Sequence, residues 1–155
     1  MPLQKQLHKP RGFDTWLAVG QTNLKVHRAL NQLLGELDLS LAQHEILVTI
    51  CRQSGLTQRE LSEYLHVVKS NATALLKKLE ARGLVQRSAD SDDSRIKRLS
   101  LTFSGEALVE KSFSVQASVI KAMASVVTDD ELELTGDIMS RVGNAVDQLT
   151  ENARD

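Results

Sequence analysis

The apolar residues of this chain change their spacing between its two ends, and this change restricts the folds that the chain can adopt. From Phe13 to Leu79 they recur every three or four positions, which is typical of one face of a helix. Between Leu84 and Phe103 they alternate with polar residues in two runs, as in paired strands, and after Gly105 the helical spacing returns. The pattern predicts a mainly α chain, α+β by strict count, with one hairpin inserted between helices.

Three helix starts are marked by capping boxes, in which a hydroxyl side chain is followed three residues later by Glu or Gln. These pairs are Ser40 with Gln43, Thr57 with Glu60, and Thr128 with Glu131. Gly55 and Gly83 stand where helices are expected to end, because glycine adopts the left-handed turn that closes a helix. We therefore expect one long helix, three short helices, a hairpin and two long helices, in that order.

The two helices after Gly55 carry distinct apolar faces. The first is expected to bury Leu61, Tyr64 and Leu65, and the second Ala72, Leu75, Leu76 and Leu79. A short helix, a turn, a second helix and a hairpin make up a winged helix-turn-helix, whose second helix can enter the major groove of DNA. The long helices at the two ends have more apolar surface than one small core needs, which points to dimerisation.

Composition excludes several classes of protein. The 155 residues are 41% hydrophobic and 25% charged, as in a folded domain, and no apolar run approaches the roughly 20 residues of a membrane span. The N-terminus lacks the apolar stretch of a secretory signal, and Cys51 is the only cysteine, so a cytoplasmic location is expected. The net charge of −1 hides an asymmetry, since residues 57–98 hold nine basic and six acidic side chains and residues 104–155 four and ten. A surface that faces a polyanion should therefore lie in the middle of the chain.

The middle segment supplies candidate DNA contacts of two kinds. Side chains on the outer face of the second short helix and on the hairpin can address bases and phosphates, and free amides at the start of the helix before it favour phosphate. The candidates are Thr57, Gln58, Ser70, Asn71, Thr73, Lys77, Lys78, Arg95 and Lys97. The polar residues of the second short helix could equally form a face that contacts only solvent. Capping of the preceding helix is a sufficient role for Thr57 and Gln58.

The stretch "SADSDDSRIKRL", residues 88–99, first suggests a metal loop. As a calcium loop beginning at Asp90 it fails, because Arg95 occupies the glycine position and Leu101 the position of the bidentate glutamate. As a hairpin tip it is rich in turn formers, and Arg95 leaves the turn where a side chain can project into a minor groove. Asp92 or Asp93 is expected to orient its guanidinium.

The segments "LTQRELSEYL", "LLKKLEARGLVQR" and "DDSRIKRLSLTFSG" resemble the MarR family of transcription regulators. The last is similar to the family's wing signature, an aspartate and an arginine two apart followed by a strand and Leu-Thr-x-x-Gly. The resemblance implies a homodimer that grips a palindromic operator with the fourth helix and the wing of each subunit. We expect a repressor, because a dimer bound at a promoter blocks polymerase without further contacts. Val68 departs from the family, which often has Ser or Thr before that helix.

The resemblance also implies release by a small aromatic or phenolic effector. The candidate pocket residues are His27, His44 and Phe113, although a core or hydrogen-bonded role accounts for each as well. No cofactor is expected, and no metal, because the histidines that zinc-responsive members place in their last helices are missing here. Cys51 lies in the apolar pattern of Ile46, Leu47 and Ile50, where a buried thiol is usually inert.

The expected organisation is a tail and dimerisation helix over residues 1–38, a DNA-binding region over 39–103 and dimerisation helices over 104–155. An enzyme is not expected, since no nucleophile with a base, carboxylate pair or phosphate loop stands out. Two alternatives stay open: a winged module that binds a protein instead of DNA, and a redox-responsive regulator that uses Cys51.

Overall fold

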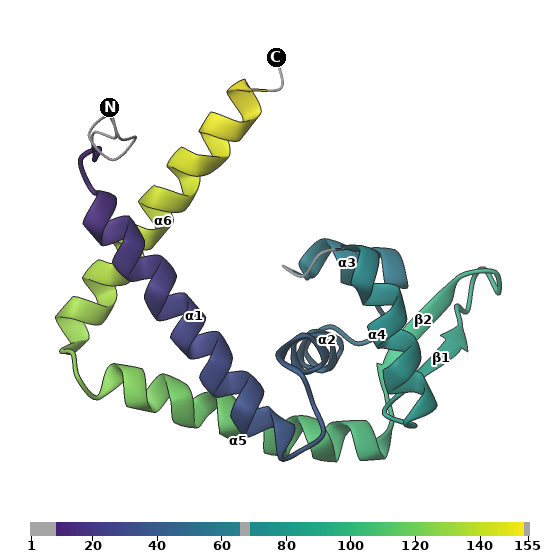
Figure 1. Cartoon of the computed structure of the whole chain (residues 1–155). Coiled ribbons are helices and arrows are strands. Elements are labelled where there is room, and N and C mark those ends of the chain that lie inside the picture. Colours follow the sequence, from purple (N-terminus) through teal and green to yellow (C-terminus); the bar gives the residue numbers. More distant parts are fainter. Residues whose placement is uncertain (1–8, 66–68, 154–155) are drawn as a thin grey trace, which may run out of the picture. The chain divides into compact units, whose positions relative to one another are not determined.

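The computed structural model describes residues 9–65 and 69–153. This part of the chain contains six helices and one two-stranded antiparallel sheet, which are labelled in Figure 1. The elements are α1 (Phe13–Gly35), α2 (Leu41–Arg52), α3 (Gln58–Tyr64), α4 (Lys69–Ala81), β1 (Val85–Ala89), β2 (Lys97–Leu101), α5 (Phe103–Ala124) and α6 (Asp129–Asn152). The element order confirms the winged helix-turn-helix with long helices at both ends. The chain forms two compact units, one up to Gln116 and one from Ala117 onward.

The three predicted capping boxes are all present. The Ser40 hydroxyl accepts from the Gln43 amide, and the Gln43 side chain accepts from the Ser40 amide in return. Thr57 with Glu60 and Thr128 with Glu131 form the same reciprocal pairs at the starts of α3 and α6. These bonds satisfy amides that have no partner inside the helix, so local sequence is sufficient to fix the three starts.

The core of the first unit forms around α2, which packs against α1, α3, α4 and β2. Its fully buried side chains include Ile46, Leu47 and Ile50. The predicted inner face of α4 is confirmed, because Ala72, Leu75, Leu76 and Leu79 are all buried. Gly83 follows α4 with a positive φ of 68°, the left-handed conformation expected after a helix.

The predicted inner face of α3 is wrong at one position. Leu61 and Leu65 are buried, but Tyr64 is 53% exposed. The helix ends at Tyr64, and Leu65 adopts an extended conformation with ψ of 129°. Leu65 is therefore no longer placed by the helical period, and it takes the buried position while Tyr64 remains at the surface.

The hairpin pairs β1 with β2 in the register Val85 with Leu101 through Ala89 with Lys97. Val85 and Leu99 are buried and anchor its inner face. At the tip, the Asp90 carboxylate accepts from the backbone amides of Asp92 and Asp93, at 2.9 and 3.3 Å. The acidic cluster thus forms the turn of the wing, as its composition predicted.

The Leu-Thr-x-x-Gly motif joins the wing to α5. Thr102 precedes the helix, and its hydroxyl accepts from the Gly105 amide at 3.1 Å and donates to the Gly83 carbonyl at 2.6 Å. A Cβ added at Gly105 would lie 2.1 Å from the carbonyl oxygen of Leu84. Only glycine therefore allows α5 to approach the start of β1 so closely.

The second unit contains the end of α5 and all of α6, and in α6 no residue is buried. Its large exposed apolar side chains recur at helical spacing; they include Ile138, Met139, Val142, Val146 and Leu149. Of α1, only Leu30 and Leu34 are buried, whereas Leu17 and Leu24 are exposed. None of the helices in residues 9–65 and 69–153 is long and apolar enough to cross a membrane.

Candidate DNA-binding surface and effector pocket

The outer face of α4 presents polar side chains to solvent. Asn71, Thr73, Lys77 and Lys78 are exposed, on the side of the helix opposite its buried leucines. The side chain of Ser70 and the whole of Val68 lie outside the described residues. The face therefore offers amide, hydroxyl and ammonium groups, which are the groups that contact base edges and phosphates.

Gln58, predicted as a phosphate contact, lies in a hydrogen-bond chain that links three elements. Its amide nitrogen donates to the Thr73 hydroxyl at 2.8 Å, and its amide oxygen accepts from Arg87 Nη2 at 3.0 Å. Arg87 in turn forms an ion pair with Glu80 on α4, with Nη2 and Oε2 3.2 Å apart. Gln58 thus ties the start of α3 to the outer face of α4 and to β1. Sequence reasoning missed Arg87 and Glu80, whose partners are seven or more residues away.

Thr57 is half-buried, and its hydroxyl group takes part in the capping box of α3. The carboxylate of Glu60 accepts from both the amide and the hydroxyl of Thr57, and these bonds hold the pKa of Glu60 below its usual range. The capping interpretation accounts for this residue without DNA.

Arg95 stands at the tip of the wing with 89% of its side chain exposed. Its guanidinium donates through Nε and Nη2 to the two carboxylate oxygens of Asp93, each at 3.0 Å. These bonds are the main cause of the lowered pKa of Asp93. Of the two acids expected to orient Arg95, Asp93 is the one that does so. The neighbouring Lys97 is also exposed, and its ammonium donates to the Ser94 carbonyl at 3.0 Å.

Arg98 joins the wing to the start of α3, and sequence reasoning did not single it out. Its Nε donates to Asp90 at 2.6 Å, its Nη1 donates to the Gly55 carbonyl at 3.1 Å, and the same nitrogen lies 3.7 Å from the Glu60 carboxylate. Backbone amides at the turn, chiefly that of Asp92, and the Arg98 guanidinium lower the pKa of Asp90. Arg98 therefore connects the wing turn to the loop before α3 and to the cap of that helix.

The three predicted effector residues do not share one pocket. His27 lies exposed on α1, whereas His44 is buried on α2. Phe113 lines an open groove of about 380 Å³ between α2 and α5, together with Val48 and Cys51.

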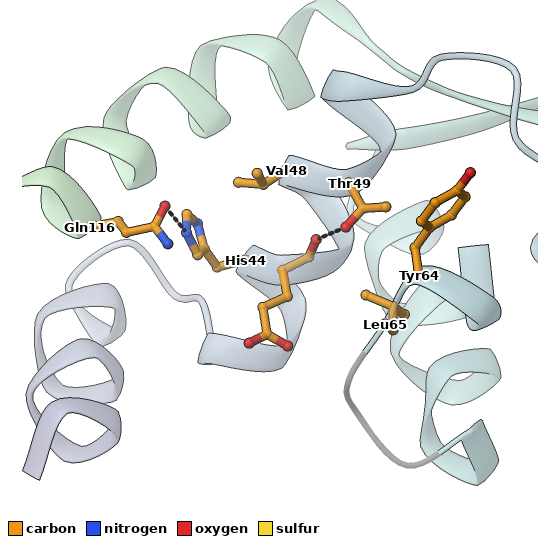
Figure 2. Close-up of a pocket in the computed structure, with 7 residues that line it drawn as sticks. His44, Val48, Thr49, Tyr64, Leu65 and Gln116 are labelled. Atoms are coloured by element: carbon orange, nitrogen blue, oxygen red, sulfur yellow. Dashed lines mark hydrogen bonds between the residues drawn. The ribbon is translucent and has the colours of Figure 1, made fainter. Parts of the chain in front are cut away.

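His44 lines a second pocket, of about 210 Å³, that Figure 2 shows in close-up. Its lining residues, all within the first unit, are His44, Glu45, Val48, Thr49, Tyr64, Leu65 and Gln116. The His44 Nε2 and the Gln116 Oε1 lie 3.4 Å apart at one end of the pocket, and Tyr64 and Leu65 stand at the other. Burial is the main cause of the lowered pKa of His44, and it outweighs the opposing effects of Gln116 and Glu45.

The expected burial of Cys51 is wrong, because this residue is exposed. Ile46, Leu47 and Ile50 point into the core, but Cys51 lies in the last turn of α2, beside the groove that it lines with Val48 and Arg52. Among residues 9–65 and 69–153, no three His, Cys, Asp or Glu side chains gather in a way that could hold a metal ion.

Comparison with known proteins agrees with this geometry. The winged helix-turn-helix fold, with polar groups on the outer face of α4 and cations on the wing, defines a class of transcriptional regulators. Residues 37–96 match the model of the MarR family. The chain is also 28% identical over 132 residues to an HTH-type transcriptional regulator of Bacillus cereus, covering 84% of this chain and 88% of that protein.

Two solved structures show the same likeness. A mutant of MarR from E. coli, complexed with operator DNA, is 28% identical with a TM-score of 0.72, covering 81% of this chain and 90% of that one. CouR from Rhodococcus jostii, bound to p-coumaroyl-CoA, has a TM-score of 0.75 at 23% identity, covering 87% of this chain and 95% of that one, and it supports the fold alone. Over residues 37–96 the chain is thus similar to the MarR family of transcriptional regulators.

Proposed function

We propose that this protein is a homodimeric repressor that binds a palindromic operator and is released by a small effector of aromatic or phenolic type. In this proposal residues 39–103 bind DNA, and residues 1–38 and 104–155 form the dimer. Genomic DNA as the target implies a cytoplasmic location. One observation carries the proposal. The polar outer face of α4 and the cations Arg95 and Lys97 of the wing are exposed on the same winged unit.

The DNA contacts follow from the groups on that unit. Asn71, Thr73, Lys77 and Lys78 are exposed on α4, and we assign them, with Ser70, to the major groove and its phosphates. Arg95 and Lys97 extend from the wing, where an arginine can enter the adjacent minor groove. Thr57 and Gln58 are proposed to act from the N-terminus of α3, with Gln58 holding Thr73 in place. The related MarR from E. coli, complexed with operator DNA, supports this proposal.

The dimer is supported by the exposed apolar faces of α1 and α6. Contiguous apolar faces of this length are uncommon on the surface of a monomer and are normally covered by another chain. A two-fold symmetric pair presents two recognition helices, which fit successive major grooves about 34 Å apart. Release then requires only that an effector favours a different spacing of the two helices.

The effector site is proposed at the pocket of His44, whose wall includes the end of α3. A ligand there contacts Tyr64 and Leu65, which directly precede the segment leading to α4. Phe113 lines the neighbouring groove. His27 is exposed on α1, so we propose that it contacts an effector only where the second subunit covers α1. In this proposal α4 is the helix that enters the major groove. Displacement of the end of α3 would move α4 and so change the affinity for the operator.

Selection of duplexes from genomic DNA tests the proposal directly. The purified protein is expected to enrich sequences with two inverted half-sites, with centres one helical turn apart, and to bind each duplex as one dimer. If the selection enriches no inverted repeat, the proposal of operator binding fails, and a winged module that binds a protein becomes the better explanation.

A further inference from the structure

The pocket beside His44 is large enough for one aromatic ring. Its volume of about 210 Å³ exceeds the roughly 150 Å³ of an engineered protein cavity that binds benzene. Val48 and Leu65 supply apolar wall, and the polar groups come from His44, Glu45, Thr49, Tyr64 and Gln116. The chemistry of these polar groups limits which ligand can bind.

The hydrogen-bond state of His44 is the first constraint. The residue is 1% exposed, and burial lowers its pKa, so the ring is neutral and carries one N–H. The Nε2 faces the amide oxygen of Gln116, which can only accept, so the hydrogen lies on Nε2. The buried Nδ1 is therefore a bare acceptor, and it has no hydrogen-bond partner among the described residues. A ligand that donates a hydrogen bond would satisfy it.

The charge of the pocket is the second constraint. Among the described residues that line the pocket, Glu45 is the one with a formal charge at neutral pH, and none is a lysine or an arginine. The Thr49 hydroxyl already donates to the Glu45 carbonyl at 2.8 Å. A carboxylate placed here would meet a negative side chain and the lone pair of His44, with no cation to balance it.

We infer that the pocket selects an uncharged aromatic hydroxyl compound, which donates to His44 Nδ1, over an aromatic carboxylate. This inference rests on the proposed effector function and narrows its ligand class to neutral phenols and aromatic alcohols. A phenol, with a pKa near 10 like the tyrosine side chain, keeps its proton at neutral pH. A phenol can donate to His44 Nδ1 and brings no negative charge next to Glu45. An ionised aromatic acid has no proton to donate and is repelled by Glu45.

Three single-ring probes separate these properties: phenol donates, anisole has no donor, and benzoate is an anion. Binding to the full-length protein is measured by titration, while the ¹⁵N resonance of His44 Nδ1 is followed by NMR. We expect phenol to bind at least about tenfold more tightly than anisole or benzoate, because they leave the buried acceptor unpaired. We also expect the Nδ1 resonance to move toward its hydrogen-bonded position with phenol only. Equal affinity for benzoate, or an unmoved Nδ1 in saturating phenol, would overturn the inference.

Two variants complete the test. In His44→Leu the preference for phenol over anisole should disappear while anisole still binds, and the exposed Lys111→Ala should behave like the wild type. If His44→Leu does not fold, the probe series and the NMR measurement on the wild type decide alone. Operator binding is assayed separately, because phenol binding that moves Nδ1 but leaves operator affinity unchanged supports the ligand class and contradicts effector release.

Discussion

Gly105 and Thr102 belong to the motif that most resembles a family signature, yet their roles in this chain are structural. The Thr102 hydroxyl bridges the Gly83 carbonyl and the Gly105 amide, and Gly105 leaves room for the Leu84 carbonyl. Arg95, in the same signature, pairs with Asp93 of the wing and stays exposed. One short motif therefore combines a joint between elements with an exposed side chain, which in our proposal contacts DNA.

The substitution Gly105→Ala tests the joint. It should lower the free energy of unfolding by about 1–3 kcal/mol, since the added methyl group meets a backbone carbonyl that cannot move aside easily. Gly136→Ala on α6 is the control, because a Cβ there meets nothing within 4 Å, and it should be neutral or stabilising by up to about 1 kcal/mol. Chemical denaturation at one protein concentration measures both. Equal effects of the two variants would show that the close approach has no energetic consequence.

The wing and α3 are joined by carboxylates whose pKa values are lowered in the folded protein. Asp90 accepts from the turn amides and Arg98, and Glu60 accepts from Thr57 and lies near Arg98. Such groups stabilise the fold above their unfolded pKa values, which are near 3.8 for Asp and 4.5 for Glu. The stabilisation is lost as the pH falls from there through the lower folded values.

Acid titration of stability should show this loss. The free energy of unfolding is expected to decrease as the pH drops below about 4.5, and Asp90→Asn should flatten the part of this slope that comes from the wing. Asn can still accept from the turn amides but cannot pair as an anion with Arg98. Asp147→Asn serves as the control, because Asp147 is exposed on α6 and lies outside the wing and the cap of α3. An Asp90→Asn profile parallel to that of the wild type would contradict the assigned role of Asp90.

The helices and strands could be predicted from short-range sequence patterns. Features that depend on contacts between distant parts of the chain could not. Capping boxes and apolar periods gave the helix starts and the buried face of α4, because these depend on residues three or four apart. Tyr64 and Cys51 were misjudged because each stands at the end of a helix, where the period no longer decides burial. The bonds from Gln58 to Arg87 and from Arg98 to Gly55 join segments that only the tertiary fold brings together. Of the candidate site, the outer face of α4 and the pairing of Asp93 with Arg95 were accessible from sequence.

The long helices at the two ends leave more apolar surface exposed than the winged unit requires. On α6 the apolar side chains gather on one face, and none of its described residues is buried. In our proposal a second copy of the chain covers this face. Two winged units are then held at a fixed spacing, which is what an inverted repeat in DNA demands.

Val142→Glu tests this arrangement, since it places a charge in the centre of the apolar face of α6. We expect the variant to be monomeric by light scattering and to lose at least about a hundredfold in operator affinity, because the two units no longer bind together. Ser140→Glu adds the same charge on the opposite side of the helix and should remain dimeric. A Val142→Glu protein that stays dimeric would remove α6 from the proposed interface.

The salt dependence of operator affinity tests the central proposal most directly. For the wild type, the logarithm of the binding constant should fall linearly with the logarithm of salt concentration, with a slope of about −0.9 for each phosphate contacted. Arg95→Ala should weaken binding and reduce the magnitude of the slope by about 2, one contact from each subunit, while Lys111→Ala on α5 should change neither. Affinity that does not respond to salt, or an Arg95→Ala protein with the slope and affinity of the wild type, would contradict DNA binding by α4 and the wing.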